Sequence, residues 1–156
     1  MDAPVAIFSL RSGRRLAYLD SRTPAGAPVL FLHGLRSCRL MRPDAEVTAA
    51  IGARLITFDR PALGQSDANP GRSLVDTADD VVALLDHLGL DKVYVAAPSG
   101  GGPPALAFAY RAPDRIHAVA IPRWTCGCVC ARSPRAECYR QVKAGRWLPA
   151  SVRARV

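Results

Sequence analysis

The sequence predicts an α/β domain with a mostly parallel sheet of about six strands and flanking helices, followed by an irregular basic tail. Three observations support this prediction. Short apolar runs typical of buried strands alternate with helical patterns, and turns rich in glycine and proline join them. The composition changes abruptly after Ile121. The 156 residues can bury one core, so we expect one domain over residues 1–121 and a tail over residues 122–156.

The first half of the domain reads as strands with one helix between them. A hairpin is expected around the turn at Ser12 and Gly13, because apolar and polar residues flank it on both sides. The segments that follow are a buried strand over 27–34, a helix within 40–52 starting near Pro43, a buried strand over 53–60 and a loop over 61–72.

The second half repeats the alternation of helix and strand. Residues 73–88 carry apolar side chains at three- and four-residue steps with aspartates between them, which predicts an amphipathic helix that ends at Gly89. A strand over 91–97, a turn, a helix to about Tyr110 and a strand over 114–121 complete the pattern.

The turn at Ser99, within YVAAPSGGGPPALAFAY, is the candidate functional site. In a parallel sheet the functional groups lie beyond the carboxyl ends of the strands, and Ser99 follows such an end. A serine between small residues, here Ala97 and Gly101, suits a sharp, strained turn that exposes its hydroxyl. The first N–H groups of the next helix favour negative charge, and the Gly100 N–H could donate to an oxyanion.

Two other interpretations of this turn remain. It could be a glycine-rich connection without chemistry. It could also bind a dinucleotide, because Gly100, Gly102 and Ala105 fit the G-x-G-x-x-A spacing after a strand. The acidic residue expected about 20 positions later at the next strand end is absent, since that strand ends in Pro122 and Arg123.

Three segments in order resemble the α/β-hydrolase family over roughly residues 13–121. They are VLFLHGLRS, FDRPALGQSD and VVALLDHLGLDKVYVAAPSGGGPPALAFAYRAPDRI. The resemblance implies an incomplete α/β-hydrolase fold and a serine hydrolase of ester-like or related acyl bonds. It implies Ser99 as nucleophile, with the backbone N–H groups of Gly100 and Leu35 as the oxyanion hole.

The resemblance also implies supporting residues around the nucleophile. Gly34 would let the Leu35 loop approach the substrate, Gly101 is the second small residue of the turn, and His33 would orient the loop. Asp59 and Arg60 would brace the same loop as structural residues. We expect a small-molecule substrate or ligand, no cofactor and no metal ion.

Some positions depart from the family pattern. Ala97 and Ala62 stand where glycines are common in the family. Pro104, the second of two consecutive prolines, would cost about 3 kcal/mol if the helix had already begun before it.

The larger departure is a missing base. A serine hydroxyl needs a base to remove its proton, and the base needs a carboxylate to orient it. In this family the acidic residue and then the histidine follow the nucleophile in the sequence. After Ser99 the candidates are His117, within a strand, and the acids Asp114 and Glu137. We therefore expect the chain to be truncated and inactive, with an exposed sheet edge that favours self-association. The alternative is a non-catalytic module that binds a ligand or a partner.

The net charge of +8 belongs to the tail. Residues 1–121 hold 13 basic and 12 acidic side chains, whereas residues 122–156 hold eight basic and one acidic. Zinc binding by Cys126, Cys128, Cys130 and Cys138 does not match the usual ligand spacing, and a basic arm for nucleic acid is a second alternative. We prefer the hypothesis of a shifted reading frame or premature end, which the coding DNA would test.

The sequence also bears on location. Neither a signal peptide nor an apolar run of membrane-spanning length is visible, so the sequence predicts a cytoplasmic protein without a membrane or nucleic-acid partner.

Overall fold

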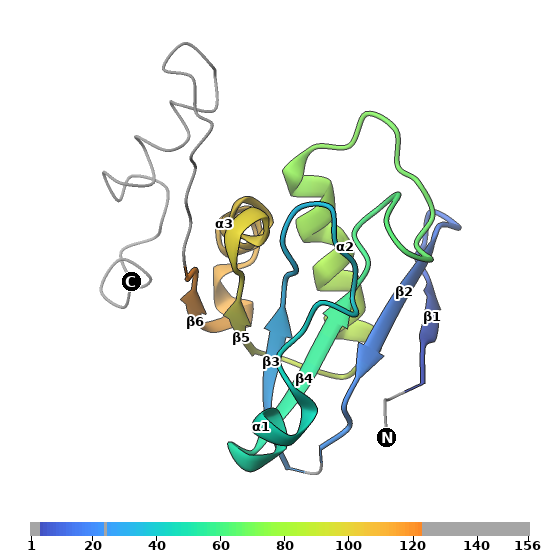
Figure 1. The fold of residues 1–156 in the computed structure, drawn as a ribbon. Helices are drawn as coiled ribbons and strands as arrows, with labels where there is room; N and C mark the ends of the chain where they lie inside the picture. The colour runs from blue at the N-terminus through green and yellow to red at the C-terminus, as the bar shows by residue number, and fades with distance from the viewer. Residues whose placement is uncertain (1–3, 24, 123–156) are drawn as a thin grey trace.

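The computed structural model describes residues 4–23 and 25–122, which form one six-stranded sheet with helices packed against it (Figure 1). The strands are β1 (Ala6–Ser9), β2 (Arg15–Asp20), β3 (Ala27–Phe31), β4 (Ala53–Phe58), β5 (Val93–Ala96) and β6 (Ile116–Ala120). The helices are α1 (Ala45–Ala50), α2 (Leu74–His87) and α3 (Gly102–Arg111), with 3₁₀ turns at Ser99–Gly101 and Pro113–Arg115.

The spatial strand order is β1-β2-β4-β3-β5-β6, and the sheet is mostly parallel as predicted. The β1–β2 hairpin joins the sheet antiparallel at β4, and β4, β3, β5 and β6 run parallel. The central strand β3 places Leu30 opposite Ile56 of β4 and Val95 of β5. All three side chains belong to the hydrophobic core, which explains the uninterrupted apolar runs of these strands.

Helices α2 and α3 pack against each other, and α1 lies next to β4. The apolar face of α2 supplies Val81, Leu84 and Leu85 to the core, in agreement with the predicted periodicity. The helix begins with a capping box, in which the Ser73 hydroxyl accepts from the Asp76 N–H and the Asp76 carboxylate accepts from the Ser73 N–H.

The ends of the elements can be compared with the sequence prediction. Helix α1 begins near Pro43 as predicted, directly after Asp44, whose carboxylate accepts hydrogen bonds from two backbone N–H groups. Strand β6 begins at Ile116, because the residues before it form a 3₁₀ turn. Helix α3 begins at Gly102, so Pro104 lies in the first turn, where N–H groups have no acceptor within the helix. The missing N–H of Pro104 therefore removes no hydrogen bond from the helix.

No helix among the described residues is long and apolar enough to cross a membrane. Likewise, the residues in 4–23 and 25–122 contain no group of three or more metal-ligating side chains. The predictions for the tail cysteines and for Glu137 lie outside the described residues.

Candidate active site

Ser99 lies at the turn between β5 and α3, beyond the carboxyl end of a parallel strand (Figure 1). Its backbone has a φ of 51°, in the left-handed region that non-glycine residues rarely adopt, and the residue is exposed. This is the strained, outward-facing turn that the pattern of small residues predicts. The serine is also close to the N-terminus of α3, where partial positive charge favours an anion.

The glycines after Ser99 allow the turn to touch the loop that follows β3. A methyl group at Gly100 would lie 2.7 Å from the backbone nitrogen of Leu35, and one at Gly101 would overlap the Leu32 carbonyl oxygen. No backbone hydrogen bond among the described residues uses the N–H of Gly100 or Leu35. Two unused N–H donors therefore lie beside the serine, on segments held together by close packing.

Arg60 joins the same two segments through its guanidinium. Its Nη1 donates to the Gly100 carbonyl at 3.1 Å, and its Nη2 donates to the Gly34 carbonyl at 2.7 Å. Burial and the charge of Arg72 lower the pKa of Arg60, but a guanidinium remains protonated in proteins. Arg60 thus links the turn at Ser99 to the loop after β3 through hydrogen bonds.

His33 contacts the Arg60 guanidinium and is fully buried. Its Nδ1 donates to the Gly34 carbonyl at 2.9 Å, and its Nε2 has no hydrogen-bond partner among the described residues. Burial lowers the pKa of His33, the hydrogen bond to Gly34 raises it and the Arg60 charge lowers it, with a net decrease. A neutral, buried imidazole fits the loop-orienting role expected of His33.

Asp59 is held by a partner that the sequence did not indicate. Its carboxylate accepts from the Arg39 backbone N–H at 2.7 Å and pairs with the Arg39 guanidinium. The Gln65 N–H donates to it at 2.8 Å, and a methyl group at Gly64 would overlap it. Arg39 belongs to the loop that carries Leu35, so this buried ion pair anchors that loop to the end of β4.

Apolar side chains lie next to Ser99. Met41 is 42 % exposed, and its sulfur would lie 3.8 Å from a methyl group at Gly34, as would Cβ of Ser99. Leu35 is 75 % exposed and packs against Gly100. The surface around the hydroxyl is therefore suited to an apolar substrate group.

None of the histidines is hydrogen-bonded to the serine hydroxyl. All three histidines of the chain are described, and the Ser99 hydroxyl has no hydrogen bond to a residue in the described ranges; the Ser99 carbonyl accepts from the Gly102 N–H. His33 points its Nδ1 at a carbonyl, His87 contacts the Tyr18 hydroxyl at 3.2 Å, and His117 is exposed and stacks on Tyr94. Within the described residues the structure brings together Ser99 and the N–H groups of Gly100 and Leu35, but no histidine is hydrogen-bonded to the Ser99 hydroxyl.

The family assignment follows from comparison with known proteins. The model of the alpha/beta hydrolase fold matches residues 27–121, which is more than half of the chain. The chain belongs to the α/β-hydrolase family. The match includes the β3 loop, the segment around Asp59 and the turn at Ser99, which are the segments that carried the resemblance in the sequence.

The relatives that this chain matches are described as different kinds of hydrolase. An uncharacterized hydrolase of Bacillus subtilis, YcgS, is 34% identical over 101 residues, which are 65% of this chain and 36% of that relative. A haloalkane dehalogenase of Psychrobacter cryohalolentis is 34% identical over 110 residues, which are 68% of this chain and 36% of that protein. The chain thus spans about a third of the length of these relatives.

Solved structures agree with this assignment. A thermophilic esterase from Thermogutta terrifontis superposes with a TM-score of 0.67 at 30% identity, over 92% of this chain and 53% of that one. The epoxide hydrolase CorEH gives a TM-score of 0.67 at 28% identity, over 76% of this chain and 41% of that one. This protein is therefore a hydrolase-family chain that corresponds to part of its relatives.

Proposed function

We propose that the protein provides the nucleophile and oxyanion hole of a serine hydrolase that acts on ester-like acyl bonds. One observation carries the proposal. Ser99 is exposed in a strained turn, beside the unused N–H groups of Gly100 and Leu35. In this reaction the Ser99 oxygen attacks the carbonyl carbon, and the two N–H groups stabilise the oxygen that becomes negative.

The chemistry of a hydroxyl favours acyl substrates over the epoxides and haloalkanes that some relatives' names suggest. Attack of Ser99 on an ester carbonyl expels an alcohol and leaves an acyl ester, which water can cleave to restore the serine. Attack on an epoxide or alkyl halide would leave an ether, which water does not cleave under the same conditions. Turnover through Ser99 is therefore possible only for acyl bonds.

We also propose that the 156-residue chain, by itself, does not turn over esters. A serine hydroxyl needs a base to remove its proton, and the three histidines contact Gly34, Tyr18 and Tyr94 and form no hydrogen bond with Ser99. The reaction would therefore stop at slow acylation. A reading frame that supplies an acid and a histidine downstream would restore the missing groups, as the sequence hypothesis of a frameshift expects.

Mass spectrometry of the full chain tests both statements. After incubation with a p-nitrophenyl ester and free imidazole as external base, we expect the acyl group on Ser99 and no acyl group on Ser73, which also precedes a helix N-terminus. Ser99→Ala should lose the modification. Acylation equal at the two serines would contradict the nucleophile, and steady turnover without imidazole that Ser99→Ala abolishes would contradict inactivity.

The oxyanion hole has a separate test in a matched pair of variants. Leu35→Pro removes the backbone N–H, whereas Leu35→Ala keeps it and removes most of the side chain. We expect Leu35→Pro to lower the rate of Ser99 acylation by about 100-fold or more, the usual cost of losing one oxyanion donor. Equal rates for the two variants would exclude the Leu35 N–H from the reaction.

The expected self-association has support in strand β6. Strand β6 pairs with β5, and no other strand in residues 4–23 and 25–122 pairs with its second edge. Analytical ultracentrifugation decides between oligomers through this edge and a monodisperse binding module, the alternative function. The cytoplasmic location stays a prediction, which cell fractionation would test.

A further inference from the structure

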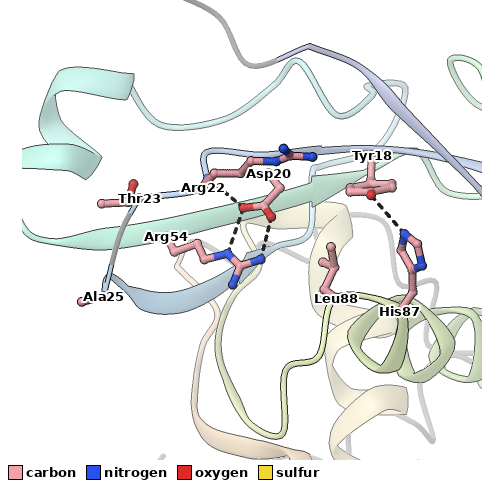
Figure 2. Close-up of a pocket in the computed structure, with 8 residues that line it drawn as sticks. All are labelled: Tyr18, Asp20, Arg22, Thr23, Ala25, Arg54, His87 and Leu88. Atoms are coloured by element: carbon pink, nitrogen blue, oxygen red, sulfur yellow. Dashed lines mark hydrogen bonds and ion pairs between the residues drawn. The ribbon is translucent and has the colours of Figure 1, made fainter.

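A pocket lies at the opposite end of the sheet from Ser99. It has a volume of about 500 Å³, within the range of small-molecule sites. Its walls come from the end of β2, the start of β4 and the end of α2, as Figure 2 shows. Ser99 follows the carboxyl end of β5, whereas Arg54 in this pocket is the second residue of the parallel strand β4.

Asp20 is the only carboxylate that lines this pocket in the described part of the chain, and both of its oxygens already accept hydrogen bonds. Asp20, 7 % exposed, accepts on Oδ1 from Arg54 Nε at 3.0 Å and from the Arg22 N–H at 2.9 Å. Its Oδ2 accepts from Arg54 Nη2 at 2.7 Å. Burial alone raises the pKa of Asp20, but the bonds and charges of Arg54 and Arg22 lower it overall, so the carboxylate stays ionised. Arg54 therefore neutralises Asp20 and is fixed in orientation by it.

Cationic donors remain after this pairing. The Arg54 Nη1 makes no hydrogen bond with a described residue, and neither does the guanidinium of Arg22. Arg22 is exposed and has a φ of 51°, an unfavourable backbone conformation that the Asp20 carboxylate holds through the Arg22 N–H. Asp20 and Arg54 would be sufficient if the only role of these charges were to link β2 to β4. Arg22 adds one positive charge that no described carboxylate in the pocket balances.

The other wall of the pocket adds polar atoms that are fixed in place. The Tyr18 hydroxyl and His87 Nε2 are 3.2 Å apart, and His87 stacks on Phe8 with ring centroids 4.4 Å apart. Tyr18 and His87 both line the pocket, and the Tyr18 hydroxyl can donate to a ligand in the tautomer in which His87 Nε2 donates to it. The pocket thus combines two guanidinium groups with a hydroxyl donor.

We propose that this pocket binds a small oxyanion, namely a phosphate or carboxylate group, with Arg22 and Arg54 as its cationic donors. Guanidinium groups match the oxygen geometry of both anions and form strong charge-assisted hydrogen bonds with them. The oxyanion compensates the charge of Arg22 and accepts from the donors that Asp20 leaves unused. Binding involves no covalent step and no group near Ser99, so it is independent of the proposed hydrolase function.

Titration calorimetry of the full chain at fixed ionic strength tests the site, with inorganic phosphate and acetate as separate probes. The variants are Arg22→Gln and Arg11→Gln, which remove the same charge from two exposed positions; Arg11 lies in the β1–β2 turn, away from the pocket. We expect Arg22→Gln to weaken binding about tenfold or more, and Arg11→Gln to leave it within about twofold. The anion that binds more tightly identifies the ligand chemistry.

Imidazole NMR signals locate the bound anion. We expect phosphate or acetate to shift the His87 ring signals and to leave those of His33 and His117 unchanged. Absence of binding of both anions up to about 10 mM would overturn the proposal. Equal weakening by the two glutamine variants, or a shift at His117 in place of His87, would overturn it as well. Ser99→Ala should bind like the unmodified chain, so failure of this site would leave the hydrolase proposal standing.

Discussion

Replacement of Arg39 by methionine tests whether the buried ion pair with Asp59 holds the loop beside the nucleophile. The two side chains are 5% and 0% exposed, so methionine leaves a buried carboxylate without its counter-charge. Breaking such a pair costs about 3–5 kcal/mol. The two backbone N–H groups that still donate to Asp59 place the expected loss at the lower end, about 3 kcal/mol of unfolding free energy.

This loss is large against the total stability of about 5–15 kcal/mol that a single domain has. Urea unfolding followed by far-UV circular dichroism measures it, with Arg11→Met as the control at an exposed position. We expect the control to stay within about 0.5 kcal/mol of the unmodified chain. Because Arg39→Met also releases the loop of Leu35, acylation of Ser99 should become slower.

The double variant Arg39→Met with Asp59→Asn separates lost charge pairing from lost packing. The asparagine is neutral and keeps an oxygen that accepts from the backbone, so the double variant should be more stable than Arg39→Met alone. Two results would refute the reasoning. One is a loss below about 1 kcal/mol in Arg39→Met, and the other is a double variant whose loss equals the sum of the single losses.

Three further changes test other parts of the site. Ala62→Gly should stabilise the chain by about 1 kcal/mol in urea unfolding, because Ala62 has a φ of 65°; a loss of stability would contradict this. Gly101→Ala should lose about 3 kcal/mol, since its methyl group overlaps the Leu32 carbonyl, and an unchanged midpoint would show that the turn can move. Because the pKa of His33 is lower in the folded chain than in the unfolded chain, the unfolded chain binds a proton at higher pH. The free energy of unfolding therefore falls as the pH drops from about 7 to 5. His33→Asn should reduce this fall, and an equal fall in the variant would assign it to other groups.

The apolar patterns of the sequence were sufficient for most of the fold. The buried strands around Leu30, Ile56 and Val95 were predicted, because residues covered on both faces of a sheet are apolar without interruption. The strained turn at Ser99 was predicted because only small neighbours allow it. The start of β6 was placed too early, since a polar 3₁₀ turn before a strand has no distinct pattern.

The contacts around the site were harder to predict than the turn itself. Arg39 lies in a loop without periodicity, and its partner Asp59 follows 20 positions later. Nothing in the sequence therefore distinguishes the buried Arg39 from Arg36, which is exposed, or from Arg42, which is half-buried. The polar pocket was missed for the same reason. Its lining residues come from three separate segments, and the proximity of Asp20 and Arg54 depends on the register of β2 on β4.

The strand order also has a consequence for how the chain folds during synthesis. Strand β3 lies between β4 and β5, although residues 59–92 separate those two neighbours in the chain. Until β5 leaves the ribosome, one edge of β3 has no partner, and its apolar side chains are open to other nascent chains. We expect the nascent protein to depend on chaperones until Ala96 has emerged, at which point pairing closes the centre of the sheet.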